Sequence, residues 1–204
     1  MTDETLLEAW RGGDGTAGQK LLERHFRPLY RFFANKACDA CDDLIQTTMM
    51  AIVGAKDQFR GESSFRTYLF TVARNVLHRH LRTLARDRLV FDPDRESVWD
   101  ITRSPSTMAA ENQRQRILLD GLRHIPIDLQ VALELHYWEE LSTSELAEIL
   151  QVPQGTVKSR LRRARQLLGE QVESLTNDPA HRAQSADDLD RWAAEMREVA
   201  GFHS

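Results

Sequence analysis

The sequence has few of the features that mark enzymes, secreted proteins or membrane proteins. It contains no glycine-rich loop of the kind that binds phosphate, and no group of residues spaced as metal ligands. It also shows no pattern that would place a nucleophile beside a general base. No apolar run approaches the length of a membrane span, and the acidic start Met1-Thr-Asp-Glu is not a signal peptide. We therefore expect no catalytic residue, no cofactor, no metal, no membrane insertion and a cytoplasmic location.

Cysteine is scarce, with Cys38 and Cys41 as the only two in 204 residues. Their C-x-x-C spacing is compatible with a redox pair or with half a zinc site. No second cysteine pair exists and no histidine lies nearby to complete a tetrahedral site. Two reduced thiols at a helix junction are therefore the favoured interpretation, and a thiol switch is the alternative.

Patterns typical of β-strands are also nearly absent, which predicts an all-α protein. In the second predicted helix Pro28 is expected to bend or restart the chain. The apolar face of the helix predicted at residues 16–36 is expected to comprise Leu22, Phe26, Leu29, Tyr30 and Phe33. The predicted helices span about residues 4–11, 16–36, 42–59, 65–88, 113–124, 127–138 and the two helices within 141–168.

Residues 141–168 have the pattern of a helix-turn-helix. Ser142 followed by Glu145 is typical of a capping box, and Pro153 suits the first turn of a second helix. The inner face of that second helix is expected to carry Val157, Leu161, Ala164 and Leu168. Lys158, Arg162 and Arg165 then form a cationic outer face that suits the DNA major groove. A charged helix pair on any all-α protein is the alternative.

Charge is unevenly distributed along the chain, although the formal net charge is only −4. Residues 60–88 contain seven arginines against two acids, and residues 155–165 contain five Lys/Arg and no acid. Residues 170–204, by contrast, contain eight acids and three arginines. Two basic segments in an acidic chain indicate two surfaces for nucleic acid.

The first basic segment interleaves its arginines with aromatic residues. Rings stack on unpaired bases and cations follow phosphates, so the combination suits single-stranded nucleic acid. Burial in the core is the alternative role for these aromatics. They are Phe59, Phe65, Tyr68 and Phe70.

The remaining segments complete the predicted organisation. The helix at 42–59 has apolar residues on more than one face, which requires a second packing partner. Residues 89–112 are expected to form a linker with a short amphipathic piece near 98–101. Residues 177–204 are expected to form an acidic extension with one amphipathic helix.

The order of these segments resembles a bacterial RNA polymerase sigma factor of the extracytoplasmic-function (ECF) group of the sigma-70 family. The resemblance rests on the Leu-Leu-x-x-Trp opening, DDLIQTT, FRGESSFRTYLFTVARN and LSTSELAEILQVPQGTVKSRLRRAR, in that order. It implies two small helical domains joined by a flexible linker, the first over residues 1–88 and the second over 113–176. It implies as partners core RNA polymerase, through its β′ coiled coil and β flap, promoter DNA and an anti-sigma factor.

The resemblance also implies a role for individual residues. Those implied to bind core polymerase are Asp43, Leu44, Gln46, Thr47 and Met50. Those implied to read and open the −10 element are Ser63, Ser64, Phe65, Arg66 and Tyr68 around a loop, and Arg74, Asn75, His78, Arg79 and Arg82 on a helix. Those implied to read the −35 element are Thr156, Lys158, Ser159, Arg160, Arg162 and Arg163.

The chain departs from the family pattern at several positions. Thr47 and Met49 replace a usual Glu and a usual aromatic, and Gln151 stands in a turn where Gly is common, so we expect a positive φ there. The acidic extension is additional, and we hypothesise that it covers a basic promoter-binding face. A conventional helix-turn-helix regulator that binds duplex DNA alone is the competing function.

Overall fold

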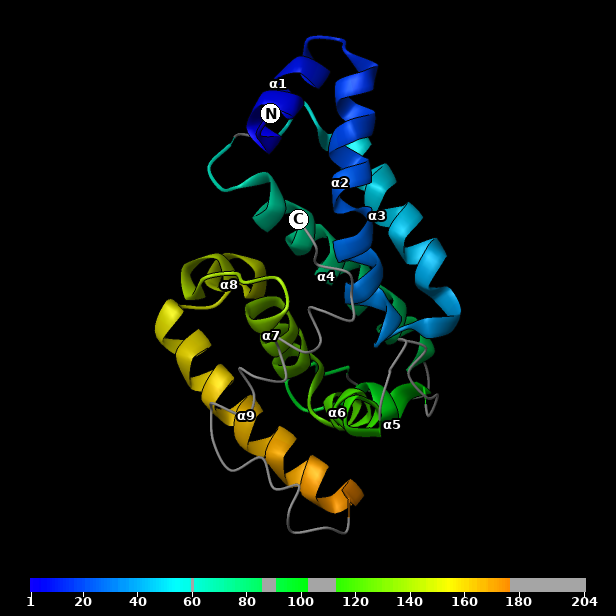
Figure 1. Cartoon of the computed structure of the whole chain (residues 1–204), viewed down its shortest axis with the longest axis vertical. Coiled ribbons are helices and arrows are strands. Elements are labelled where there is room, and N and C mark those ends of the chain that lie inside the picture. The colour runs from blue at the N-terminus through cyan, green and yellow to red at the C-terminus, as the bar shows by residue number, and fades with distance from the viewer. Residues whose placement is uncertain (60, 86–90, 103–112, 177–204) are drawn as a thin grey trace.

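The computed structural model describes residues 1–59, 61–85, 91–102 and 113–176. Within these ranges every regular element is a helix (Figure 1), and an isolated bridge joins Ser97 to Pro126. The all-α prediction is thereby confirmed. The helix predicted for the C-terminal extension lies outside the described residues, as do Arg60 and residues 89–90 and 103–112 of the predicted linker.

An N-terminal unit occupies the upper part of Figure 1. Asp14 caps its second helix by accepting from the backbone N–H groups of Thr16 and Ala17. Ser64 caps its last helix by accepting from the Thr67 N–H. The elements are α1 (Asp3–Arg11), α2 (Gly15–Ala34), the short 3-10 helix η1 (Cys38–Ala40), α3 (Cys41–Ala55) and α4 (Phe65–Leu84).

Helix α2 differs from its prediction in two respects. It continues through Pro28 without ending there, so of the bend or restart expected at Pro28 the restart is excluded. Phe26 and Tyr30, predicted to face inward, are 48% and 43% exposed. The buried face instead includes His25 and Phe32, because contacts with α1, α3, α4 and α7 surround a different sector of the helix.

A C-terminal unit begins within the predicted linker, at α5, and lies in the lower part of Figure 1. Its α8 and α9 form the predicted helix-turn-helix. The Ser142–Glu145 capping box is present, and Gln151 adopts the left-handed conformation with φ of 56°. Both expectations are confirmed. The elements are α5 (Val98–Thr102), α6 (Gln113–His124), α7 (Ile127–Tyr137), α8 (Thr143–Leu150) and α9 (Gln154–Thr176).

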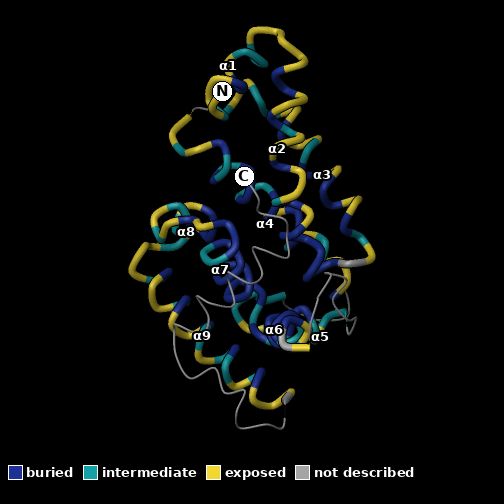
Figure 2. Tube along the Cα trace, in the orientation of Figure 1, coloured by how far each residue is buried: buried dark blue, intermediate teal, exposed yellow. Residues whose placement is uncertain are grey.

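Helix α7 lies in the centre of the molecule, where Figure 2 shows it as predominantly buried. Every residue from 127 to 135 is buried, including Asp128, Gln130 and Glu134. It contacts α6, α8 and α9 of its own unit and α2 of the N-terminal unit, while α4 packs against α8. The two units are therefore docked, and polar residues of α7 face the N-terminal unit.

Candidate nucleic-acid and polymerase interfaces

The outer face of α9 is the most open of the predicted DNA surfaces. Val157, Leu161, Ala164 and Leu168 are buried as predicted, which turns the opposite face of the helix outward. Of the residues predicted to read the −35 element, those with exposed side chains are Lys158, Ser159, Arg162 and Arg163. Arg165 was predicted to share this face but is partly buried, because it donates to Tyr137 Oη at 3.0 Å.

Helix α4 divides its predicted DNA-reading residues between two environments. Asn75, Arg79 and Arg82 are exposed, and the Arg82 guanidinium lies over the Phe91 ring at 5.6 Å from its centroid. Arg74 is buried at 8% exposure, and His78 is half-buried. Both of the latter face α7, so only part of this surface is open to solvent.

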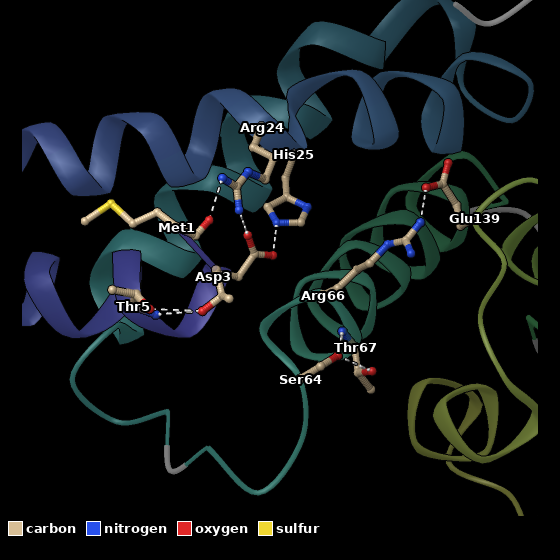
Figure 3. A network of polar contacts seen from close by, with 10 residues as sticks. Met1, Asp3, Thr5, Arg24, His25, Ser64, Arg66, Thr67 and Glu139 are labelled. Atoms are coloured by element: carbon tan, nitrogen blue, oxygen red, sulfur yellow. Dashed lines mark hydrogen bonds and ion pairs between the residues drawn. The ribbon is translucent and has the colours of Figure 1, made fainter. Parts of the chain in front are cut away.

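The loop before α4 is built around backbone geometry and a cap. Gly61 has a φ of 72°, which favours glycine, and Ser64 Oγ accepts from the Thr67 N–H at 3.0 Å (Figure 3). Ser63 is partly buried. Ser64 thus has a structural role in starting α4 in addition to its predicted role in DNA reading.

The aromatic residues of this segment are largely core. Phe65 is 2% exposed and packs against the rings of His25 and Phe59, so it is not available to a DNA base as the family resemblance implied. Burial of this ring at the start of α4 is what anchors the helix. Tyr68 is partly exposed and lies against Phe59 with ring centroids 4.7 Å apart.

Asp128 is the centre of an ion-pair cluster between the two units. Its Oδ1 accepts from Arg74 Nε at 3.0 Å and its Oδ2 from Arg74 Nη2 at 2.5 Å, a two-pronged arrangement. His78 Nε2 lies 2.9 Å from Oδ1. Burial opposes ionisation, but His78 and Arg74 outweigh it and lower the pKa of Asp128 to about 2.

Arg160 of α9 reaches the same carboxylate. Its Nη2 lies 2.6 Å from Asp94 of the linker, and its Nη1 lies 3.6 Å from Asp128 Oδ2. Arg160 is one of the residues predicted to read the −35 element. In this structure its guanidinium lies away from the exposed face of α9.

Two further carboxylates of the C-terminal unit bind cations of the N-terminal unit. Glu139 accepts from Arg31 Nη2 at 2.8 Å. It also accepts from Arg66 Nη2 at 2.7 Å, as Figure 3 shows. Glu134 pairs with the fully buried Lys36, whose pKa is lowered because burial disfavours the ammonium more than Glu134 stabilises it. Arg66, another residue predicted to read DNA, is therefore also engaged.

Helix α3 presents the surface predicted to bind polymerase. Asp43, Gln46, Thr47 and Met50 are exposed, with Met50 64% exposed. Leu44 is only 7% exposed and belongs to the core. The prediction that it contacts polymerase is therefore wrong for this structure, because its side chain is buried. Residue spacing alone did not distinguish Leu44 from its neighbours, because α3 packs on both α2 and α4.

The predictions missed three apolar residues beside this surface. Phe26 and Tyr30 of α2 and Val53 of α3 are exposed, and Phe26 lines a groove together with Leu22 and Met49. The excess of apolar residues on both helices was the available signal. Together with Met50 they give this face an apolar character.

Cys41 is the cysteine whose side chain the structure describes, and the Cys38 side chain lies outside that description. Cys41 is buried, with its Sγ 3.7 Å from the Tyr30 carbonyl oxygen. Among the described residues, no three His, Cys, Asp or Glu side chains gather in a way that could hold a metal ion. In the same part of the chain, no helix is both long and apolar enough to cross a bilayer.

Comparison with known families gives two matches in the order of the two units. A model described as Sigma-70 region 2 matches residues 21–87, and one described as Sigma-70, region 4 matches residues 115–168. Together they cover more than half of the chain. The first match contains α4 and its basic face, and the second contains α7 and the helix-turn-helix.

Relatives that match over nearly their whole length are also sigma factors by name. The ECF RNA polymerase sigma-E factor of Haemophilus influenzae is 29% identical over 184 residues, which are 86% of this chain and 97% of the relative. The protein of the same name from Escherichia coli K12 is 29% identical over 185 residues, covering 86% and 96%. These matches extend through both units.

A solved structure shares the fold. It is the sigma factor RpoE in complex with the anti-sigma factor NepR from Bartonella quintana. The likeness has a TM-score of 0.56 at 24% identity and covers 75% of this chain and 92% of that chain.

Proposed function

Because the chain belongs to the ECF group of the sigma-70 family, and is thus an alternative sigma factor that directs transcription initiation, we propose that its two units divide promoter reading between them. Such a factor is a dissociable specificity subunit of RNA polymerase, and sigma factors in general are not enzymes. Its place of action is the cytoplasm, together with polymerase. The observation that supports the division of roles is the presence of separate cationic surfaces on α4 and α9.

The unit over residues 1–88 binds core polymerase and reads the −10 element. Asp43, Gln46, Thr47 and Met50 contact the β′ coiled coil, and the apolar neighbours Phe26 and Tyr30 extend that contact. Asn75, Arg79 and Arg82 hold DNA at the −10 element, and Tyr68 at the edge of the loop supplies a ring for an unstacked base. The exposure of these side chains supports the assignment.

The unit over residues 113–176 reads the −35 element and meets the β flap. Lys158, Ser159, Arg162 and Arg163 enter the major groove from the N-terminal half of α9, where polar and guanidinium groups distinguish base edges. Thr156 lies in the first turn of the same helix and contributes to the same DNA-reading surface. The cations that do not reach bases hold phosphates.

Transcription in vitro tests this function. The protein is added to bacterial core polymerase on a library of promoters from its own genome. We expect specific initiation that core alone does not give, with start sites that reveal both elements. Tight duplex binding by the protein alone, without initiation, would instead identify a conventional helix-turn-helix regulator.

The regulator expected from the family resemblance is an anti-sigma protein. Affinity purification of the protein from its native cell, followed by mass spectrometry, identifies what binds it besides polymerase. Recovery of polymerase subunits and no other protein would contradict this expectation.

A further inference from the structure

The docked arrangement engages residues from both predicted promoter-reading sets. Arg74 and His78 of the −10 set and Arg160 of the −35 set all lie within 3.6 Å of the Asp128 carboxylate. Arg66 of the −10 set pairs with Glu139. Four of the residues that the family resemblance implies to read DNA therefore hold carboxylates of the protein itself.

These contacts resemble the way a protein holds a phosphate. Arg74 grips Asp128 through Nε and Nη2, one nitrogen to each carboxylate oxygen, and the same guanidinium fork matches a phosphate. The Asp128 side chain is 2% exposed, and because its pKa is lowered it stays ionised from neutral pH down into the acidic range. It therefore presents a fixed negative charge where DNA would otherwise bring one.

The docked arrangement is incompatible with reading both elements. Elements centred near −35 and −10 lie about 25 base pairs apart, which is roughly 85 Å along duplex DNA at 3.4 Å per base pair. Arg74 is implied to read the −10 element and Arg160 the −35 element, yet both contact the carboxylate of Asp128. The units must separate before both sets of residues can engage one promoter.

We propose that Asp128, supported by Glu139, is an intramolecular latch that occupies both promoter-reading surfaces and keeps the free sigma factor from binding DNA. The inference rests on the proposed function, because it needs the two units to read the two promoter elements, and it takes the roles of Arg66, Arg74, His78 and Arg160 from the family resemblance. Separation of the units exchanges these carboxylates for DNA phosphates. The polymerase face on α2 and α3 lies outside the latch, so core polymerase can bind first.

The test compares full-length variants in the absence of polymerase. Asp128→Asn removes the charge of the latch, and Glu139→Gln does the same at the second cluster. Glu170→Gln, on the exposed surface of α9, is the control that removes one negative charge from the same unit. The probe is a fluorescently labelled forked DNA of random sequence, titrated at several salt concentrations.

For Asp128→Asn we expect an affinity for the forked DNA higher by about tenfold, because breaking one side of a buried ion pair favours separation. The salt dependence should steepen by about one to three in log–log slope, because additional cations then meet phosphate. Small-angle scattering should show a larger radius of gyration. Glu170→Gln should change the affinity less than twofold and leave the slope and the radius unchanged.

The outcomes distinguish the latch from the proposed function. Equal affinity, slope and radius for Asp128→Asn, Glu139→Gln and Glu170→Gln would overturn the latch, even if the wild type initiates with core polymerase. Failure of the wild type to initiate would overturn the proposed function, whatever the latch variants do. Circular dichroism and binding to core polymerase confirm that each variant is folded.

Discussion

The basic faces of α9 and α4 have similar chemistry and different surroundings. On α9, Lys158, Arg162 and Arg163 extend into solvent, whereas on α4 Arg74 is buried against Asp128. The difference comes from Asp128 of α7, which faces Arg74 of α4 and not the outer surface of α9. A cationic pattern along a helix therefore specifies what the face can bind, and the neighbouring element decides whether the face is available.

The largest expected effect is at the most buried ion pair between the units. Glu134→Ala leaves Lys36 buried without its carboxylate, so the free energy of unfolding should fall by about 3–5 kcal/mol in chemical denaturation. Replacing both residues, with Lys36→Met and Glu134→Leu, should recover most of that loss. A double variant as unstable as the single one would show that Lys36 has no part in the effect.

Acid should weaken the ion pairs that Asp128 makes with α4, whereas the exposed cations of α9 have no such carboxylate to lose within the part of the chain that the structure describes. The folded-state pKa of Asp128 is lowered from 3.8 to about 2. Its contribution to stability is therefore fully present above about pH 4 and is lost as the pH falls toward 2. Unfolding measurements over this range should show a loss of roughly 2 kcal/mol that Asp128→Asn does not show. A pH profile identical in the two proteins would contradict the assignment.

A single cation of the open face should matter for promoter reading. Arg162→Ala should reduce initiation with core polymerase by about tenfold, because one guanidinium contact in the major groove is lost. Lys20→Ala, on the exposed surface of α2, is the matched control and should leave initiation unchanged. Initiation assays on a promoter found with the wild-type protein measure both. Equal activity of the two variants would remove Arg162 from the −35 set.

The position of the open face depends on the helix that precedes it. Ser142→Ala removes the side-chain half of the capping box and should lower the unfolding free energy by about 1 kcal/mol. Ser174→Ala, on an exposed turn of α9, should have almost no effect. Thermal unfolding of the two variants makes the comparison, and a similar change in both would show that the cap does not contribute.

The smallest expected effect is a gain at the turn between α8 and α9. Gln151 has a φ of 56°, so Gln151→Gly should raise the free energy of unfolding by about 0.5–1 kcal/mol. Gln151→Val should lower it, because a β-branched side chain fits this backbone region poorly. Chemical denaturation resolves both changes. A loss of stability with glycine would indicate that the glutamine side chain has its own stabilising contact.

Local patterns in the sequence predicted much of the fold. The capping box at Ser142, the buried stripe of α9 and the positive φ at Gln151 depend on residues close together in the chain, and all three are present. The short amphipathic piece predicted near 98–101 forms the helix α5. These features need no knowledge of distant partners.

Features that depend on distant partners were not predictable in the same way. Arg74 and Leu44 were assigned to outer surfaces, and α7 or the N-terminal core covers them. For Phe65 the sequence left a DNA-reading role and burial in the core both open, and the ring is buried. Phe26 and Tyr30 were assigned to the core and are exposed. An apolar or charged residue on a helix has the same local pattern in either place, and only the packing of other helices determines its environment.

The ion pairs of Asp128 and Glu139 also affect how free molecules are distributed in a cell. A genome offers an enormous excess of nonspecific phosphate sites, which retain proteins that carry unpaired cations. Molecules whose Arg66, Arg74 and Arg160 are neutralised internally are retained less by this DNA. A larger fraction of the pool should then stay in solution, where polymerase meets it by diffusion.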